Sequence, residues 1–336
     1  MFFHHMVVNK PLKLVYCFVP KAGCTFWKRA FYYIQKTQEN EYMGSLFDIK
    51  KDEIHRLGMD KLTEVGGDFA SKYAFLNDAK KIIIVREPYS RLFSAWVDKL
   101  FLPDFWRYIG VPIVQNYRSG AGITALQCGH DVSFYEFLRY VVDIGRATTF
   151  TVQQFDDHWL PISRVCQTCH VKYDIIGRMD DFSRSRDAIL TSTGMHKYIA
   201  TNISSMETDI DNIKLNIEAY WFTSQKNPKC ISQYDLLTRL WASFQFQGFL
   251  PSDMPLQLDI VKANGQLTME GFLKLVSDAH VHFIKESPKR GKVQRKEAMI
   301  RAYQTVPRYL LYKIKDLFHL DFSLYGYDPE PMEIFG

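Results

Sequence analysis

Residues 16–31 read YCFVPKAGCTFWKRAF, and this stretch indicates the fold. The residues from Leu12 to Val19 are mostly apolar and β-branched or aromatic, which is typical of a buried strand. Apolar residues then recur at helical spacing from Phe26 to Ile34, which predicts a helix that ends near Lys36. The residues between them predict a tight loop that joins the strand to the helix.

A second strand–loop–helix pattern follows at Lys81–Val85, where KIIIV is short and fully apolar, as parallel strands are. Arg86-Glu87-Pro88 ends this strand, and apolar residues at helical spacing continue from Leu92 to Leu100. A further strand and polar turn are predicted within 171–182. These units predict an α/β fold with a central parallel sheet and flanking helices.

The remaining sequence is mainly helical in pattern. SFYEFLRYVVD (133–143) predicts an amphipathic helix with a serine cap and a glutamate three residues later. From about Arg186 to Arg301 the chain alternates between amphipathic helices and short polar turns. Apolar runs are only a few residues long, whereas a membrane-spanning helix needs about 20. The opening MFFHHMVVNK is too short, and too interrupted by histidine, for a signal peptide.

The composition is that of a globular chain of one large domain or two modest ones, with 336 residues, 47% of them hydrophobic. The net charge of +5 is too small to indicate nucleic-acid binding by itself. It suits an anionic cofactor or a polyanionic acceptor if the excess gathers on one face. One basic run stands out at Lys285–Lys296, for which a solvated loop is the alternative interpretation.

The first loop has the features of a phosphate-binding site. Its backbone N–H groups lie at the positive end of the predicted helix, and Gly23 allows close approach of a ligand. Thr25 can cap the helix and donate to a phosphate, and Lys21 adds a full positive charge. The lysine precedes the glycine, so the loop is not a Walker motif. The candidate residues are Pro20, Lys21, Ala22, Gly23, Cys24, Thr25 and Phe26.

The second loop predicts another anion site. Arg86 directly follows a buried strand, where ligands bind in open parallel sheets. Arg91 and Ser94 are three residues apart and share a helix face. Two guanidinium groups and a hydroxyl can bind a second phosphate. Pairing of Arg91 with Glu87 or Asp98 is the alternative.

VPKAGCTFWKR and VREPYSRLFSAW resemble the two cofactor motifs of the Golgi carbohydrate sulfotransferases, and the nearest branch acts on chondroitin and dermatan 4-positions. FDDHWLPISRVCQTCHVKYDIIGRMDDF (155–182) resembles the family's His-Trp-x-Pro block with its Cys-x-x-Cys. LFHLDFSLYGYDP resembles the family's C-terminal ending. The resemblance covers about residues 11–186 and 305–328.

This resemblance implies a P-loop-like sulfotransferase fold and the donor 3′-phosphoadenosine 5′-phosphosulfate (PAPS). Pro20–Phe26 then bind the 5′-phosphosulfate, and Arg86 and Ser94 bind the 3′-phosphate. Lys21 is the expected catalytic cation, because negative charge grows on the departing phosphate oxygen. The implied acceptor is a sugar hydroxyl, GalNAc 4-O of a chondroitin- or dermatan-like glycan, and no metal is implied. The implied location is the Golgi lumen, as a type II membrane protein whose anchor lies outside this chain.

The general base is predicted from the same blocks. His158 is the first candidate, since histidine titrates near neutral pH, and a structural role beside Trp159 is its alternative. His55 and Glu53 are weaker candidates. Cys166 and Cys169 allow zinc with His158 or His170, but structural zinc usually needs a second paired motif. Disulfides are the expectation in a Golgi lumen, and Asn202-Ile-Ser204 is a glycosylation sequon.

The expected domain plan has four parts. Residues 1–10 form an N-terminal extension and 11–190 the PAPS-binding core. Residues 191–300 form a helical insert on the acceptor side, and 301–336 a helix and tail that pack on the core. Two other functions remain: an ATP-dependent kinase, which the lysine spacing disfavours, and a non-catalytic glycan- and nucleotide-binding protein of the same fold.

Overall fold

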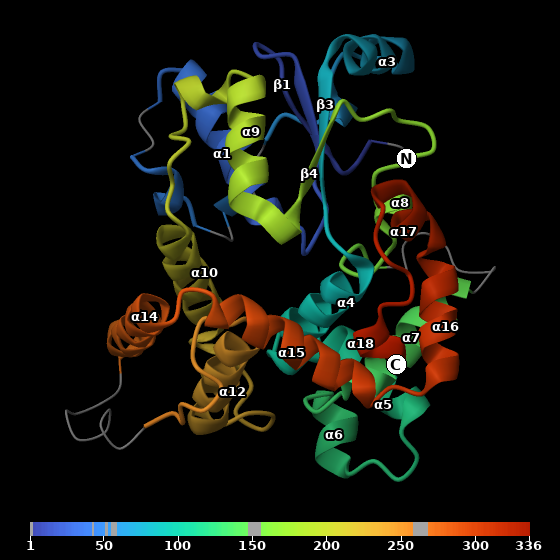
Figure 1. Cartoon of the computed structure of the whole chain (residues 1–336), viewed down its shortest axis with the longest axis vertical. Helices are drawn as coiled ribbons and strands as arrows, with labels where there is room; N and C mark the ends of the chain where they lie inside the picture. The colour runs from blue at the N-terminus through green and yellow to red at the C-terminus, as the bar shows by residue number, and fades with distance from the viewer. Residues whose placement is uncertain (1–2, 42–43, 51–52, 55–58, 147–155, 258–267) are drawn as a thin grey trace. The chain divides into compact units, whose positions relative to one another are not determined.

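The computed structural model describes residues 3–41, 44–50, 53–54, 59–146, 156–257 and 268–336 (Figure 1). The chain divides into two compact units, and each is built from separate segments. The first unit comprises Met1–Arg91, Phe150–Ile203 and Phe318–Pro329. The second comprises Leu92–Thr149, Ser204–Leu317 and Glu330–Gly336. Each unit combines separate segments of the chain, whereas the domain plan expected from the sequence consisted of continuous segments.

A four-stranded sheet lies at the centre of the first unit, with strand order β1-β2-β3-β4. The strands are β1 (Met6–Asn9), β2 (Leu14–Cys17), β3 (Lys80–Val85) and β4 (Ile175–Arg178). β2, β3 and β4 are parallel, as predicted, whereas β1 pairs antiparallel with β2. The α/β prediction is confirmed, and the sheet is mixed rather than purely parallel.

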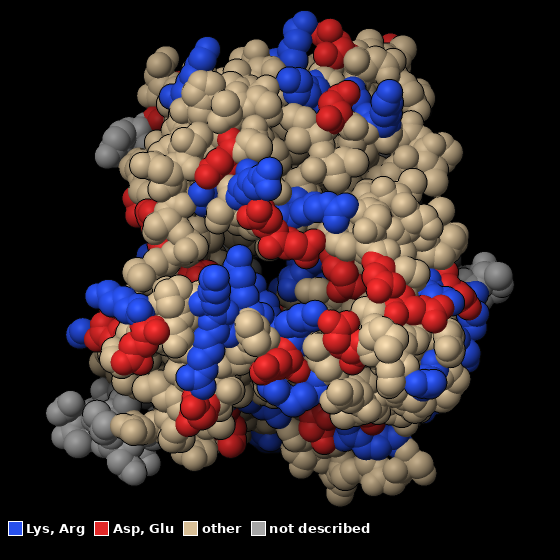
Figure 2. Space-filling model, viewed as in Figure 1, with Lys and Arg blue, Asp and Glu red and all other residues tan. Residues whose placement is uncertain are grey.

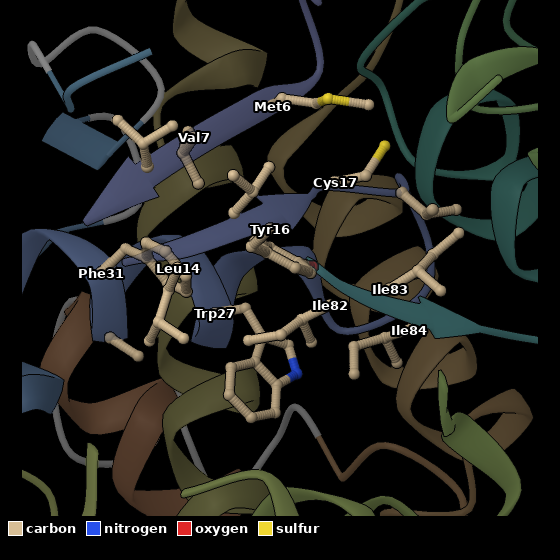
Figure 3. Close-up of a cluster of buried hydrophobic side chains, with 14 of the residues drawn as sticks. Met6, Val7, Leu14, Tyr16, Cys17, Trp27, Phe31, Ile82, Ile83 and Ile84 are labelled. Carbon is tan, nitrogen blue, oxygen red and sulfur yellow. The ribbon is translucent and has the colours of Figure 1, made fainter. Parts of the chain in front are cut away.

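Strand β2 and the last four residues of β3 are buried, because both faces of the sheet are covered there. Val15, Tyr16 and Ile82 have no exposed surface. The Tyr16 ring packs against Trp27 and Phe31 of the first helix, at centroid distances of 6.0 and 5.7 Å (Figure 3). The spacing of four between these two residues places both on the helix face that meets the sheet.

Strand β1 is the element that the sequence pattern did not reveal. Residues 1–10 were expected as an extension ahead of the core, but Met6 pairs with Cys17 and Asn9 with Leu14. A run of only four strand residues is too short to give a periodic signal of its own. The connecting turn places Lys13 in the left-handed region, with φ of 50°.

Helices complete the first unit. The longer ones, of ten residues or more, are α1, α3 and α9, whereas α8 and α17 have four and seven residues. Their bounds are α1 (Cys24–Gln38), α3 (Phe69–Asp78), α8 (Ile162–Val165), α9 (Phe182–Ser192) and α17 (His319–Tyr325), with 3-10 turns η1 (Leu46–Asp48), η2 (Leu62–Glu64), η6 (Met179–Asp181) and η7 (Met195–Lys197).

The second unit is helical in its described residues. Helix α4 (Pro88–Trp96) leads into it from the first unit and is followed by a π-helical turn, η3 (Val97–Phe101). The other elements are η4 (Trp106–Gly110), α5 (Val111–Tyr117), α6 (Ile123–Cys128), α7 (Phe134–Arg146), α10 (Ser205–Tyr220), α11 (Thr223–Lys226), α12 (Gln233–Phe246), α14 (Met269–Glu286), α15 (Arg290–Gln304), α16 (Arg308–Leu317) and α18 (Met332–Phe335).

Two local predictions in this unit are confirmed. Ser133 caps α7, because its Oγ accepts the N–H of Glu136 at 3.2 Å, and the Glu136 carboxylate accepts the N–H of Ser133 at 2.9 Å. The predicted helical region beyond Arg186 is also helical in its described part. A disulfide joins Cys128 to Cys230. None of the helices in the described ranges is long and apolar enough to cross a membrane.

Candidate functional site

The candidate site lies where the three parallel strands of the first unit end. The loop of residues 18–23 follows β2, Arg86 follows β3, and Met179 follows β4. Because β2, β3 and β4 are parallel, their carboxyl ends share one edge of the sheet. This edge is where ligands bind in open α/β sheets.

The loop after β2 has a backbone shape that suits an anion. Lys21 and Gly23 both lie in the left-handed region, with φ of 65° and 73°. Gly23 begins helix α1, and no described side chain caps that helix end. A Cβ on Gly23 would lie 2.9 Å from the Phe182 ring and 3.0 Å from the Met179 sulfur. The loop therefore requires glycine, and the first N–H groups of a 15-residue helix begin directly behind it.

Arg86 connects this loop to the end of β3. Its Nη1 donates to the Lys21 carbonyl at 2.9 Å, and its Nε donates to the Ser90 hydroxyl at 3.1 Å. The side chain is half-buried. The two anion motifs predicted from the sequence are thus in direct contact in the structure.

Glu87 caps helix α4. Its carboxylate oxygens accept the N–H groups of Tyr89 at 2.8 Å and Ser90 at 2.6 Å. Burial raises the pKa of this carboxyl group to about 7, although the two N–H groups and the Arg86 charge oppose the rise. The role of Glu87 here is therefore to hold the start of α4 in place.

Arg91 lies in the interior of the first unit, with 1% of its surface exposed. Its Nε donates to the Pro20 carbonyl at 3.0 Å, its Nη1 to the Leu160 carbonyl at 2.6 Å, and its Nη2 to the Asp157 carbonyl at 2.7 Å. Burial lowers the pKa of Arg91 to about 10, and nearby carboxylates, that of Asp321 first, oppose this. The side chain binds three backbone carbonyls, whereas the sequence suggested a phosphate or an acidic partner.

Ser94, the other predicted ligand on this helix, lies one turn beyond Arg91. It is half-buried and belongs to the part of α4 that is assigned to the second unit.

His158 occupies a short turn that Arg91 holds from both sides. Its Nδ1 lies 2.6 Å from an Asp156 carboxylate oxygen, and the same oxygen accepts the backbone N–H of His158 at 2.8 Å. About a quarter of the side chain, 24%, is exposed. A carboxylate on Nδ1 orients an imidazole as it does in catalytic histidines. The structure therefore provides an oriented and accessible histidine.

The same turn is fastened to β2 and to the tail. A disulfide joins Cys17, the last residue of β2, to Cys166, which follows α8. The buried Asp321 carboxylate of α17 accepts the N–H groups of Ile162 at 2.6 Å and Ser163 at 2.8 Å, so it caps α8. Burial raises the pKa of Asp321, against these N–H groups and Arg91.

Cysteine pairing was open from the sequence, and the structure assigns two disulfides. Cys24 and Cys169 are free thiols. Since Cys166 is bonded to Cys17, it cannot ligate a metal as a thiolate, which removes the Cys166–Cys169 zinc interpretation. The described part of the chain contains no cluster of three or more potential metal ligands.

The C-terminal segment packs on the same edge of the sheet. The Tyr89 hydroxyl donates to the Pro329 carbonyl at 2.7 Å, and the Tyr89 and Phe322 rings lie 5.2 Å apart. Arg178, at the end of β4, donates to the Tyr325 carbonyl and stacks over the Tyr327 ring at 4.9 Å. The four sequence blocks that are far apart along the chain thus meet at one place.

Most predicted site residues of the first unit come together here. Pro20–Phe26, Arg86, Arg91 and His158 lie at the sheet edge or contact segments that do. Glu53 is exposed, and His55 lies outside the described residues. Sequence reasoning missed Asp156, Ser90 and Asp321. The signal for Asp321 was its place in the C-terminal block LFHLDFSLYGYDP, which the family resemblance covers.

The structure is an α/β fold in which the loops that follow β2 and β3 are joined at one edge of the sheet. The profile described as "Sulfotransferase family" matches residues 4–241. The chain therefore belongs to the sulfotransferase family, and the resemblance seen in its motifs is confirmed at that level. No solved structure was found to match the chain.

Curated relatives are carbohydrate sulfotransferases. Rat carbohydrate sulfotransferase 11 is 29% identical over 204 residues, which cover 58% of this chain and 54% of that protein. Zebrafish carbohydrate sulfotransferase 14 is 31% identical, with 58% and 50% covered, and human carbohydrate sulfotransferase 9 is 32% identical, with 55% and 40% covered. The chain spans about half the length of the curated relatives it matches, and the likeness to several of them does not select a branch.

Proposed function

We propose that the protein is a carbohydrate sulfotransferase that moves a sulfuryl group from PAPS to a sugar hydroxyl. The contact between Arg86 and the Lys21 carbonyl carries this proposal, since it joins two anion-binding loops at one sheet edge. The donor has two anionic groups on one nucleotide, and two joined sites match this chemistry. Family membership supports the same reaction class.

The loop residues fit such a donor. Gly23 leaves a position that a Cβ would fill, and the uncapped end of α1 directs backbone N–H groups toward a ligand. Pro20–Phe26 would hold the 5′-phosphosulfate, and Arg86 with Ser94 would hold the 3′-phosphate. Arg91 would support the first loop through its hydrogen bond to the Pro20 carbonyl and would not contact the nucleotide itself.

The reaction forms a bond from sulfur to the acceptor oxygen and breaks the bond from sulfur to the phosphate oxygen. Lys21 and the α1 N–H groups stabilise the negative charge that develops on the departing oxygen. His158 accepts the proton of the attacking hydroxyl, with Asp156 stabilising the imidazolium that forms. The His158 imidazole is held by Asp156 and the α1 N–H groups by the helix, so these groups are oriented before the donor binds, which favours electrostatic catalysis.

The acceptor is proposed to be an anionic glycan of the chondroitin or dermatan type, modified at GalNAc 4-O. Figure 2 shows lysine and arginine side chains gathered over helix α15. Lys285, Lys289 and Lys292 are exposed and make no ion pair with a described residue. These charges complement sulfate and uronate groups. A glycan acceptor and the two disulfides also fit a Golgi-lumenal location.

The decisive experiment is transfer of labelled sulfate from PAPS to desulfated chondroitin, dermatan and heparosan. Transfer to one of them, with the label recovered on a defined hydroxyl, establishes the reaction and the acceptor. Donor binding without transfer to any acceptor would instead favour a non-catalytic glycan- and nucleotide-binding protein. Absence of donor binding in a folded preparation contradicts the proposal.

A further inference from the structure

We propose that Arg91 is a positioning residue that sets the donor loop and the His158 turn relative to each other. This inference rests on the proposed function, but its contacts do not. One guanidinium donates to Pro20 in the loop and to Asp157 and Leu160 on either side of His158. A single side chain therefore connects the segment for the leaving group with the segment for the base.

The geometry requires a guanidinium. Three N–H groups point to three carbonyls that belong to two segments 137 to 140 residues apart, which we obtain from residues 20, 157 and 160. Arginine presents its donors in a fixed planar fork, whereas lysine presents one ammonium on a flexible stem. The buried charge has to be compensated, and the carboxylates of Asp321 and Asp157 do so through space.

A disulfide also links the same two parts of the chain. The Cys17–Cys166 disulfide ties the residue before the loop to the residue after α8. It keeps the segments together but does not orient the carbonyls beside His158. Substitution of Arg91 is therefore expected to disturb the placement of the His158 turn against the donor loop more than it disturbs folding, because the disulfide remains.

The test is a double-mutant cycle with Arg91→Lys and His158→Ala. In the otherwise native protein, we expect Arg91→Lys to lower kcat by about 100-fold. In the His158→Ala background, we expect it to lower the single-turnover rate less than about fivefold, because the group through which it acts is gone. Equal losses in both backgrounds would refute a role through His158.

The effect of Arg91 on the donor loop is measured separately, as nucleotide affinity. Affinity for adenosine 3′,5′-bisphosphate, measured by calorimetry, should fall about 10-fold with Arg91→Lys in either background, because Pro20 is released. An unchanged affinity would refute the role in the loop. The matched control is Arg186→Lys: Arg186 is also 1% exposed and donates to the Ile203 carbonyl, but it contacts neither segment. Arg186→Lys should change neither kcat nor the affinity for adenosine 3′,5′-bisphosphate.

NMR of the His158 imidazole tests the role of Arg91 without requiring that the protein sulfate a glycan. The ¹⁵N signals of the His158 imidazole should shift with Arg91→Lys and not with Arg186→Lys, whether or not any glycan is sulfated. If Arg91→Lys does not fold, Arg91→Ala in the presence of added guanidinium serves instead, and donor affinity should return with guanidinium. Signals that do not move, or affinity that does not return, would overturn the proposal.

Discussion

Arg86 donates a hydrogen bond of 2.9 Å to the backbone carbonyl of Lys21, 65 residues earlier in the chain. This contact means that the loop after β2 and the end of β3, both proposed to bind anions, are structurally connected. A ligand group bound by Arg86 would therefore lie next to the loop that contains Lys21, and we expect a substitution in one loop to affect the other. Experiments on either residue must therefore separate direct ligand contact from loop geometry.

Two ligands can make this separation for Arg86. If Arg86 binds the 3′-phosphate, Arg86→Ala should weaken adenosine 3′,5′-bisphosphate by about 10- to 100-fold, the loss of a hydrogen bond to a charged group. Adenosine 5′-monophosphate, which lacks the 3′-phosphate, should be affected much less. Calorimetry measures both. Equal weakening of the two nucleotides would assign Arg86 to loop geometry alone.

Lys21→Ala should lower kcat by about 100-fold or more, with a smaller effect on donor affinity, because the charge on the leaving oxygen is greatest in the transition state. Alanine retains a Cβ, so the left-handed backbone at φ 65° is no more strained than before. Lys13 is the matched control, since it also has a positive φ, of 50°, but lies in the β1–β2 turn. An unchanged turnover number would remove Lys21 from the mechanism.

His158→Ala should lower kcat by about 100- to 10,000-fold, the usual contribution of a general base, and leave donor affinity unchanged. Asp156→Asn should lower kcat as well, because the His158 Nδ1–H would no longer donate to a carboxylate. Steady-state kinetics with saturating acceptor measure both. A near-normal rate for His158→Ala would make His158 a structural residue.

Gly23→Ala should both destabilise the protein and impair donor binding. A left-handed alanine costs about 1–2 kcal/mol, and its Cβ would also meet the Phe182 ring at 2.9 Å. Gly194→Ala is a matched control, because φ is 77° there but no atom lies within 4 Å. Urea unfolding and calorimetry should show a similar backbone cost for both, and a loss of donor affinity only for Gly23→Ala. Equal donor affinity in the two variants would contradict the close approach at Gly23.

Glu87 should make stability depend on pH. Its pKa is raised to about 7 in the folded protein from an ordinary 4.5, so the folded state binds the proton more tightly than the unfolded state. The corresponding stabilisation is fully present below about pH 4.5 and is lost as the pH rises through 7. Glu87→Gln should flatten the pH dependence of the unfolding free energy over this window. An unchanged pH profile would show that Glu87 titrates normally.

The strands that could be predicted from the sequence are those with a short, fully apolar run of residues. KIIIV ends at Val85 in both the prediction and the structure, because Arg86-Glu87-Pro88 cannot continue a buried strand. β1 was not predictable, since its four residues become a strand only by pairing with β2. Strand existence there depends on a partner rather than on local pattern.

The contact between the two loops was in part predictable, because Gly23, Lys21 and Arg86 all follow predicted parallel strands, whose carboxyl ends share one edge of a sheet. The burial of Arg91 was not visible. Its helix face turns toward Pro20 and the His158 turn, and only the tertiary structure places those carbonyls within reach. The disulfide of Cys17 with Cys166 was hidden for the same reason, since the two are 149 residues apart.

The first unit has a consequence for how the protein is made. Its opening segment ends at Arg91, whereas its closing segment is Phe318–Pro329, so a ribosome delivers most of the second unit in between. Until residue 321 leaves the exit tunnel, α8 lacks the carboxylate that caps it. The N-terminus of α8 is therefore capped only after every strand of the described sheet has been synthesised, because β4 ends at Arg178.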